Sequence, residues 1–438
     1  MDLRKKVGVI SLGCDKNRVD TEKALAELQR AHEIVTDIEN ADVVIINTCA
    51  FLESAREEAV SEILSAIEYK NDGVIERIIV TGCLPQKFVN ELYDELIEVD
   101  AFLGVSNYGE ILSVIERVYN GERVNAVTEP KNEKSVKRVL STSGYAYLKI
   151  ADGCDNHCTY CLIPNIRGKY RSIDPELLIE EVKGLGEVNE LILVAQDTTA
   201  YGKDLCGQIN LTYLIKKLSA LDCVKGIRLL YCYPENVTDE LIEEMASNPK
   251  VIPYIDIPLQ HADKKILKLM NRKGSAEEYL ALLEKLRAKI DGIAVRSTFI
   301  TGFPQEDETA FENLIEFIKK ANLTSAGFFA YSREEETASN KLTGHLDEKT
   351  KQKRLKKLYS VQTQVASRNN KKLVGKTVKV VCEGFDENQF VYYGRAYFSA
   401  PDVDGKVYFF SADEVEYGSY YDVKIIKNTG LDLYGERL

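Results

Sequence analysis

The stretch that decides the fold is YAYLKIADGCDNHCTYCLIPNIRGKYRS, residues 145–172. It starts with an apolar run, Tyr145–Ile150, that predicts a β-strand, and continues into a polar loop that carries Cys154, Cys158 and Cys161. Parallel α/β folds place ligands at the carboxyl ends of their strands, so the three thiols fall where a site is expected. Three thiolates on one loop can hold three corners of a 4Fe-4S cluster and leave one iron without a protein ligand. The sequence thus predicts an iron–sulfur centre with one open coordination position.

Two other interpretations of this loop stay open. His157 lies between the first two cysteines and would complete a zinc site of three thiolates and one imidazole. Alternatively, the cysteines occur together by an accident of composition and belong to a core. The polar character of the loop argues against a core, and zinc ribbons usually supply two separate pairs of thiols. We therefore prefer the iron–sulfur interpretation and expect His157 to be an ordinary loop residue.

Five more apolar runs follow the cysteines, with helical periodicity between them. Six βα units within residues 144–345 predict a partial (βα)6 barrel, because a complete ring would need about eight such units. The six runs are Tyr145–Ile150, Glu190–Ala195, Ile227–Cys232, Ile252–Ile257, Ile293–Ile300 and Ala326–Tyr331.

A second set of cysteines is spread through the first 125 residues. Cys14, Cys49 and Cys83 are separated by 35 and 34 residues, and each follows an apolar run. One βα unit between successive cysteines would bring the three thiols to the same edge of a parallel, Rossmann-like sheet. A single cysteine at a strand end is commonly plain packing, but three in register predict a second three-cysteine site. The preceding runs are Val7–Leu12, Val43–Asn47 and Ile78–Thr81.

The remaining segments complete an α/β chain of several domains. A polar stretch without periodicity predicts a linker, a charge-rich stretch with one apolar stripe predicts a helical bridge, and short β runs at the C-terminus predict a small all-β barrel. The domain plan is 1–125 (parallel α/β), 126–143 (linker), 144–345 (partial barrel), 346–374 (helical bridge) and 375–438 (β barrel). The C-terminal runs are Thr377–Cys382, Phe390–Tyr393, Val407–Phe410 and Asp422–Ile426.

Composition narrows the function further. The chain has 438 residues, ten cysteines, four histidines and a net charge of -12, which argues against a general nucleic-acid coat. No apolar stretch approaches the length of a membrane span and the start lacks a signal-peptide pattern, so we expect a cytoplasmic protein without a membrane partner. A reducing compartment keeps thiols free, which favours metal binding over disulfides. Four cysteines show no useful spacing and are expected to be ordinary thiols, with Cys232 the one nearest a strand end: Cys206, Cys223, Cys232 and Cys382.

These motifs together resemble a known family. The C-x-x-x-C-x-x-C segment after the first barrel strand is the signature of radical S-adenosylmethionine enzymes, and its flanks resemble the methylthiotransferase branch. Further blocks agree, namely SLGCDKNRVDTE, INTCAFLESAREEA, TGCLP, IDIPLQHADKKILKLMNR and RSTFITGFPQE. The resemblance covers the whole chain, including a C-terminal barrel similar to the TRAM domain of that family.

The resemblance implies two 4Fe-4S clusters, an auxiliary cluster on the N-terminal triad and a radical cluster on the second. In this family S-adenosylmethionine chelates the open iron, and an electron from a low-potential donor cleaves it to a radical that removes hydrogen from an unactivated carbon. A second S-adenosylmethionine methylates the sulfur held by the auxiliary cluster. No catalytic side chain is assigned beyond the clusters. Candidates for S-adenosylmethionine contacts, each with plain strand-end structure as the alternative, are Tyr160, Gln196, Asp197, Arg296, Thr301 and Gly302.

Charge and motifs bear on the substrate. Residues 1–125 carry a net charge of -11, residues 126–374 of +3 and residues 375–438 of -4. A tRNA-binding TRAM domain should be basic, whereas an acidic surface suits a basic ribosomal protein. The blocks SLGCDKN, LLYCYPE and GRAYFSAPDVDG also resemble the ribosomal-protein branch. We therefore expect methylthiolation of the β-carbon of an aspartate in a small-subunit ribosomal protein of the uS12 type.

Two alternatives remain. One is a tRNA-adenosine methylthiotransferase with the same chemistry, and the other is a non-catalytic iron–sulfur carrier protein. Contact with nucleic acid is a secondary expectation, through the basic helix at residues 349–372, which is otherwise a solvated helix face.

Overall fold

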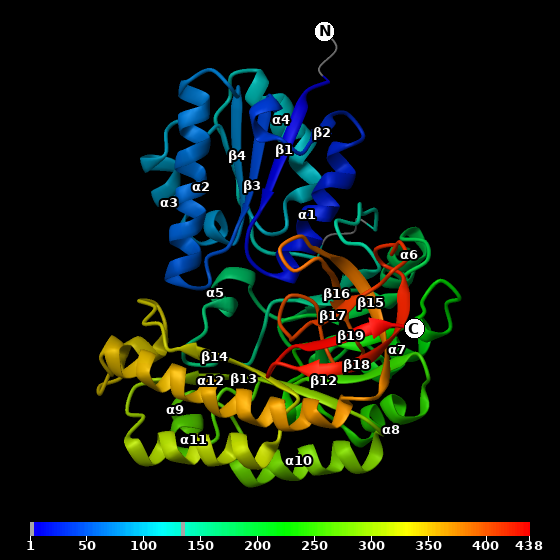
Figure 1. Ribbon diagram of the computed structural model, residues 1–438. Coiled ribbons are helices and arrows are strands. Elements are labelled where there is room, and N and C mark those ends of the chain that lie inside the picture. The colour runs from blue at the N-terminus through cyan, green and yellow to red at the C-terminus, as the bar shows by residue number, and fades with distance from the viewer. Residues whose placement is uncertain (1–3, 133–135) are drawn as a thin grey trace.

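Strand β7, which precedes the three cysteines of residues 154–161, starts a six-stranded parallel sheet in the computed structural model, which describes residues 4–132 and 136–438. The strand order is β14-β13-β12-β11-β10-β7, so the sheet forms part of a barrel with helices on its outside (Figure 1). All six predicted runs are strands of this sheet. The strands are β7 (Tyr145–Lys149), β10 (Glu190–Val194), β11 (Ile227–Leu229), β12 (Val251–Asp256), β13 (Ala294–Thr301) and β14 (Ser325–Ala330).

The outer helices of this barrel begin at residues that favour a helix N-terminus. Most begin just after a Ser, Thr, Asp or Asn whose side chain accepts a hydrogen bond from a backbone amide of the first turn, the usual N-cap arrangement. These helices are α6 (Pro175–Gly184), α7 (Leu211–Ser219), α8 (Asp239–Ser247), α9 (Lys264–Leu269), α10 (Ala276–Lys289) and α11 (Glu308–Ala321), whereas the short helix α5 (Ile163–Arg167) packs against the N-terminal domain. A short antiparallel pair, β8 (Ala151–Asp152) and β9 (Arg171–Ser172), flanks the cysteines.

The N-terminal domain is also a parallel sheet, with strand order β2-β1-β3-β4-β5-β6. Helices α2 and α3 pack on one face, and α1 and α4 pack on the other (Figure 1). The sequence predicts three of these strands and misses β2, β5 and β6, each of which has three residues and lies in no longer apolar run. The elements are β1 (Lys6–Ser11), α1 (Asp15–Leu28), β2 (Glu33–Val35), β3 (Val43–Thr48), α2 (Glu53–Asn71), β4 (Arg77–Gly82), α3 (Cys83–Glu95), β5 (Ala101–Leu103), α4 (Ile111–Tyr119) and β6 (Val124–Ala126).

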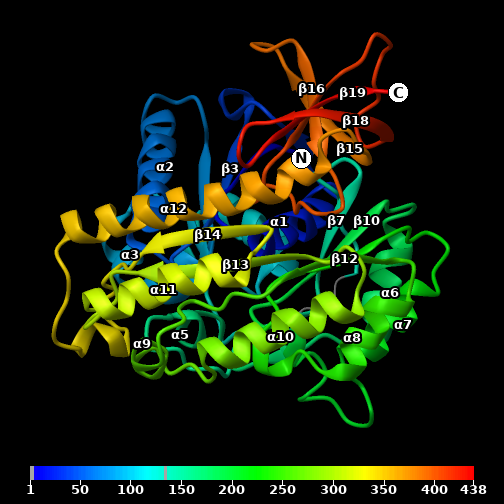
Figure 2. The same cartoon turned by 60° about the horizontal axis from the view of Figure 1, so that its bottom comes forward.

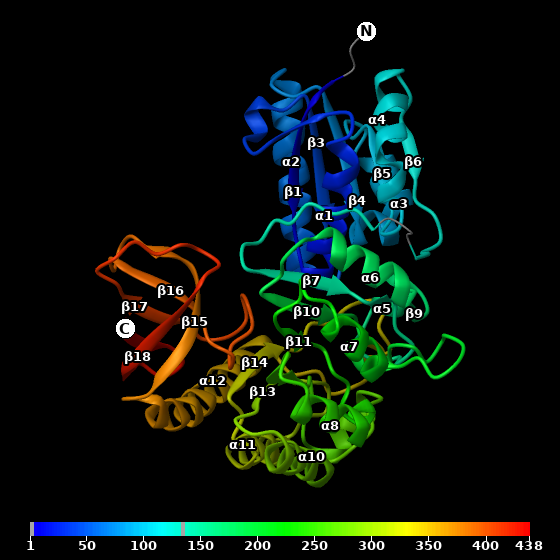
Figure 3. The ribbon, with the colours of Figure 1, turned by 90° about the vertical axis from the view of Figure 1, so that its right-hand side faces the viewer.

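The C-terminal part consists of one long helix, α12 (Glu348–Asn370), and a closed barrel with strand order β15-β16-β17-β19-β18. Figure 3 shows this barrel beside the junction of the other two domains. The sequence predicts four of the five strands and misses β19, which is five residues long. The strands are β15 (Thr377–Asp386), β16 (Val391–Arg395), β17 (Val407–Phe410), β18 (Tyr420–Asn428) and β19 (Leu433–Arg437).

The predicted linker is tied into the fold by one buried cation. The side chain of Arg138 is fully buried between Glu22 of α1, at 3.0 Å, and Glu181 of α6, at 2.9 Å. Two carboxylates around one guanidinium compensate the burial of its charge. This contact fixes the N-terminal domain against the partial barrel. Within the described ranges, no helix is long and apolar enough to cross a membrane.

Candidate metal centre

The second cysteine triad lies on residues 154–161, which we call the cysteine loop. Cys154 is buried, and the other two thiols are half-buried. The amide of Asn156 donates a hydrogen bond to Cys154 Sγ at 3.5 Å, and the amide of Ile163 donates one to Cys161 Sγ at 3.4 Å. Backbone amides that point at sulfur stabilise thiolates, so the loop is built to hold them.

A glycine precedes a cysteine in both triads for a steric reason. Gly153 has φ +76°, and a Cβ on it would lie 2.1 Å from a backbone oxygen. Gly82, before Cys83, has φ +99°, and a Cβ there would lie 2.3 Å from Asn47 Oδ1. Only glycine combines this backbone conformation with such close approach. The strands therefore turn sharply at their carboxyl ends and leave the thiols at the sheet edge.

Arg272 stands beside the cysteine loop. Its Nη1 lies 4.0 Å from Cys158 Sγ, and its Nη2 donates to the carbonyl of Pro258 at 2.7 Å. The guanidinium also lies over the ring of Tyr233, 4.2 Å from its centroid. These contacts are to a carbonyl and an aromatic ring, so the positive charge stays available to the thiolates.

Burial sets the protonation state of the thiols in the cysteine loop. It raises the pKa of Cys154 to about 11 and that of Cys161 to about 12, although the Arg272 cation lowers the pKa of Cys161. Metal ligation requires the thiolate form, so binding of a cluster releases protons here.

The first triad meets at the carboxyl edge of the N-terminal sheet. Cys14 is the N-cap of α1, Cys49 follows β3, and Cys83 is the first residue of α3. Their strands β1, β3 and β4 are neighbours in the sheet. The backbone just before Cys14 is close to the second thiol, because a Cβ added to Gly13 would lie 3.4 Å from Cys49 Sγ. Cys14 is exposed, Cys49 half-buried and Cys83 buried, so the site has one open side.

Arg167 joins the first triad to the cysteine-loop domain. Its Nη2 lies 3.4 Å from Cys83 Sγ and donates to Asn17 Oδ1 at 2.7 Å. The same guanidinium binds Asp152 Oδ2 at 2.8 Å and Asp20 Oδ2 at 3.2 Å.

This network is almost completely buried. Arg167 is 2% exposed, and Lys149, which also binds Asp20 and Asp152, is 8% exposed. Two cations and two carboxylates thus neutralise one another between the domains.

The sequence analysis did not single out Arg167 or Arg272. Both lie within the quoted family blocks, but only the folded chain brings them to sulfur.

The donor sets fit iron–sulfur clusters better than single metal ions. Each triad supplies three thiols, and cation or backbone donors lie next to the sulfurs. Within residues 4–132 and 136–438, no three Cys, His, Asp or Glu side chains converge as ligands of one metal ion. His157 is exposed, with φ +48°, and its carbonyl accepts from Asn271 Nδ2 at 3.0 Å. These observations do not support a zinc site completed by His157.

Two of the predicted S-adenosylmethionine contacts lie next to the cysteine loop. Gln196 Nε2 donates to Asp152 Oδ1 at 3.1 Å, while its buried Oε1 has no partner in the described chain. Asp197 accepts from Asn156 Nδ2 at 3.0 Å and from Thr199 Oγ1 at 2.7 Å. The free amide oxygen makes Gln196 the better ligand candidate, because Asp197 already serves to hold Asn156 of the loop.

Tyr160 is half-buried within the loop. It packs against the cluster of Ile266, Met270 and Phe303, and burial raises the pKa of its hydroxyl well above the ordinary value. A neutral phenol beside Arg272 would form part of the wall of the S-adenosylmethionine site.

Arg296, Thr301 and Gly302 have other partners. Arg296 binds Asp256 Oδ1 at 2.9 Å and lies 3.4 Å from Asp404 of the C-terminal barrel. Thr301 Oγ1 and the amide of Gly302 both donate to the Glu306 carboxylate at 3.0 Å. These contacts favour structural roles, and the assignment of the three residues to S-adenosylmethionine stays a prediction.

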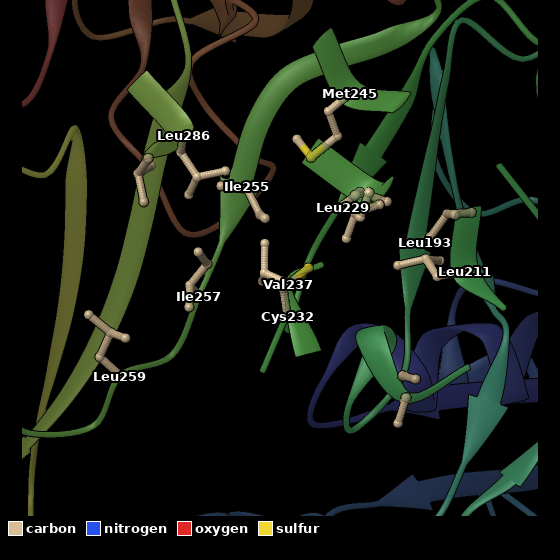
Figure 4. Packing of buried hydrophobic residues seen from close by; sticks show 14 of the residues in the cluster. Leu193, Leu211, Leu229, Cys232, Val237, Met245, Ile255, Ile257, Leu259 and Leu286 are labelled. Atoms are coloured by element: carbon tan, nitrogen blue, oxygen red, sulfur yellow. The ribbon is translucent and has the colours of Figure 1, made fainter. Parts of the chain in front are cut away.

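The four remaining cysteines are free thiols. Cys232 lies within the apolar core of the partial barrel, together with Leu229, Val237 and Ile257 (Figure 4). Cys382 is buried in the C-terminal barrel, Cys223 is half-buried, and Cys206 is exposed.

Comparison with known proteins identifies the family of the chain. Residues 148–318 match the radical SAM superfamily, residues 6–104 match the uncharacterized protein family UPF0004, and residues 374–438 match the TRAM domain. The chain is 46% identical to the ribosomal protein uS12 methylthiotransferase RimO of Acetivibrio thermocellus, over 99% of this chain and 98% of that one. It is also 46% identical to the RimO of Clostridium botulinum strain Eklund 17B, over 98% and 97%.

The chain belongs to the RimO family of methylthiotransferases. It is a radical S-adenosylmethionine transferase, and such enzymes use an iron–sulfur cluster together with S-adenosylmethionine. The RimO assignment rests on sequence, since solved structures share only the fold. The methyltransferase TsrM of Kitasatospora setae, with cobalamin and a [4Fe-4S] cluster bound, is 13% identical with a TM-score of 0.57, over 77% of each chain. The cobalamin-dependent S-adenosylmethionine radical enzyme OxsB with aqua-cobalamin bound is 13% identical with a TM-score of 0.52, over 82% of this chain and 56% of that one.

Proposed function

We propose that this RimO-family chain transfers a methylthio group to the β-carbon of an aspartate in ribosomal protein uS12, and that it does so in the cytoplasm. The names of its relatives support the protein substrate. The observation that carries the proposal is the pair of three-thiol sites joined by Arg167, which contacts Cys83 on one side and Asp152 of the cysteine-loop domain on the other. One centre is suited to radical formation and the other to holding sulfur.

Each triad would hold one 4Fe-4S cluster. When bound, the clusters and S-adenosylmethionine supply the electron transfer, the radical and the methylthio group. The chain's own residues position these groups. Arg272 places a cation near Cys158, Gln196 offers its free amide oxygen beside the cysteine loop, and Asp197 fixes the loop through Asn156. A low-potential donor must provide the electron.

The substrate would approach through a cleft of about 690 Å³ beside the first triad. Cys14 lines this cleft, together with Asp402 and Asp404 of the C-terminal barrel and linker residues 141–143. We call it the Cys14 cleft. It gives the exposed side of the first triad access to solvent, and all three domains contribute to its walls. A flexible segment of a ribosomal protein would thus be bound by the TRAM-like barrel while its aspartate reaches the clusters.

The deciding experiment is mass spectrometry of ribosomal proteins from cells without this gene. We expect uS12 to lose a methylthio group on one aspartate, and a plasmid copy to restore it. The Cys154→Ala variant should fail to restore it, whereas the Cys206→Ala variant, which changes an exposed thiol outside both triads, should restore it. An unchanged uS12 mass together with loss of methylthioadenosine from tRNA would instead establish the tRNA alternative. Unchanged uS12 and tRNA together with absence of 5'-deoxyadenosine formation would favour the carrier alternative.

A further inference from the structure

A second cleft lies on the outer side of the cysteine loop. It has a volume of about 610 Å³ and is lined by loop residues 155–157 and by the segment from α9 to Gly274. We call it the cysteine-loop cleft. Its cations are Lys203, Lys264, Lys268, Arg272 and Lys273.

The charge of this cleft is opposite to that of the whole chain. Five cations face two carboxylates, Asp155 and Glu235, in a protein with a net charge of -12. Lys264 and Lys268 are exposed and lie one turn apart on α9. Their neighbour Lys265 pairs with Asp307 at 3.3 Å, whereas no carboxylate of the described chain lies within ion-pair distance of Lys264 or Lys268. Unpaired lysines gathered in one place suit an acidic partner.

The basic segment is joined directly to the cysteine loop. Asn271 Nδ2 donates to the carbonyl of His157 at 3.0 Å, and Thr159 Oγ1 donates to the carbonyl of Leu269 at 2.8 Å. Arg272 lines the cleft and also lies 4.0 Å from Cys158 Sγ. A protein bound here would therefore sit on the outer wall of the radical cluster.

We propose that the cysteine-loop cleft is the docking surface for an acidic, low-potential, one-electron carrier protein. This inference rests on the proposed function, because only a radical cluster at this loop needs such a partner. In the step, the carrier's reduced cofactor loses one electron and the cluster gains it, with no bond made or broken. The substrate uses the Cys14 cleft, so both partners can be bound at once.

RNA is the other anionic partner that a basic cleft would attract. The structure favours the carrier protein, since base stacking needs open aromatic faces. The rings that line the cleft are Tyr233, one face of which is covered by Arg272, and the imidazole of His157.

The test uses the full chain with reconstituted clusters and a purified acidic flavodoxin as probe. We expect Lys264→Glu/Lys268→Glu to weaken binding of the probe about tenfold or more at low salt, because like charges then face each other. The matched control is Lys319→Glu/Lys320→Glu, with the same change in charge on the last turn of α11. That turn precedes β14 and so lies at the opposite end of the strands from the cysteine loop. The control should bind within about twofold of the unchanged protein, since distant surface charges are screened.

Stopped-flow reduction of the cluster gives a second readout. The Lys264→Glu/Lys268→Glu variant should be reduced slowly by the flavodoxin and at the ordinary rate by photoreduced deazariboflavin, a small uncharged reductant that needs no docking. Equal binding and equal reduction of both variants by the flavodoxin would overturn the proposal, and so would loss of binding to ribosomes or RNA without loss of binding to the probe. Neither readout depends on the substrate, so a failed uS12 assignment would be seen separately.

Discussion

The two cysteine triads each have an arginine next to a sulfur, and the two arginines have different surroundings. Arg167 beside Cys83 is bound by two carboxylates, so its charge is neutralised between the domains. Arg272 beside Cys158 is bound by a carbonyl and an aromatic ring, so its charge is not neutralised. The comparison indicates that the first arginine holds the domains together, while the second contributes positive charge beside the cysteine loop, where we propose the radical cluster.

The largest expected effect concerns the independence of the two triads. A Cys14/Cys49/Cys83→Ala triple variant should lower the iron content from about eight to about four per chain, if each triad binds one four-iron cluster. It should still cleave S-adenosylmethionine, because the cysteine loop is unchanged, but should not transfer a methylthio group. Iron analysis and chromatography of 5'-deoxyadenosine measure these outcomes. An iron content that stays at its original level would show that the first triad holds no cluster.

The next effect is on stability. Arg167→Met should lower the free energy of unfolding by about 3–5 kcal/mol, because it leaves two buried carboxylates with Lys149 as their remaining cation. Arg272→Met removes no carboxylate partner and should cost only about 1 kcal/mol, the value of its hydrogen bond to Pro258. Urea unfolding of both cluster-free variants gives the comparison. Equal losses of unfolding free energy in the two variants would contradict the distinction between the two arginines.

The third prediction concerns the reduction potential of the radical cluster. Arg272→Gln removes a positive charge near Cys158 and should make the potential more negative, because a nearby cation stabilises the more negative, reduced cluster. Arg171→Gln serves as control, because the Arg171 guanidinium donates to the backbone carbonyls of Arg167 and Lys169 and, within the described chain, contacts no sulfur of the loop. A spectroscopic redox titration of the loaded protein measures the change. A potential equal to that of the unchanged protein would mean that Arg272 acts only in packing.

The smallest effect is a pH dependence at the joint between the partial barrel and the C-terminal barrel. Burial alone would raise the pKa of Glu190, but Arg228 and Arg395 overcome it and hold the pKa below the ordinary value of 4.5. A carboxyl with a lowered pKa adds stability that is fully present above pH 4.5, and this stability is lost as the pH falls through the folded-state pKa.

Thermal unfolding of the unchanged chain should therefore show a lower Tm as the pH falls below about 4.5. Glu190→Gln should be less stable at pH 7 and should lose less stability on acidification. Glu187→Gln, on an exposed carboxylate three residues earlier, should behave as the unchanged protein. A Glu190→Gln variant with the full acid dependence of the parent would show that this carboxylate does not link pH to the joint.

The placement of the first three thiols at one sheet edge could be predicted because it depends on local order, and their role as cluster ligands stays a prediction. Each thiol of the first triad follows a strand by a few residues, and strands repeated at one βα period must place those residues at one sheet edge. The six barrel strands were also predicted, because long apolar runs such as Glu190–Val194 are buried on both faces and give a strong signal.

The short strands and the role of Arg167 could not be predicted, because they depend on contacts between residues that are distant in sequence. Strands such as Ala101–Leu103 are too short for periodicity to show, and β19 pairs in parallel with β17 across the barrel. Arg167 reaches Asn17 and Asp20 of α1 across almost 150 residues of chain. No local pattern distinguishes such an arginine from one on a solvated helix, so its role appears only in the folded molecule.

Helix α12 has a consequence for self-association of the protein. The partial barrel is open, so β14 is an edge strand, and Figure 2 shows α12 lying along it. Tyr359 of the helix donates a hydrogen bond to the carbonyl of Phe328 at 3.1 Å, and Lys351 donates one to the carbonyl of Tyr331 at 2.9 Å. Exposed edge strands pair with one another and aggregate. The helix that leads to the TRAM-like barrel therefore also shields the catalytic barrel from self-association, and a chain truncated before residue 346 would form aggregates.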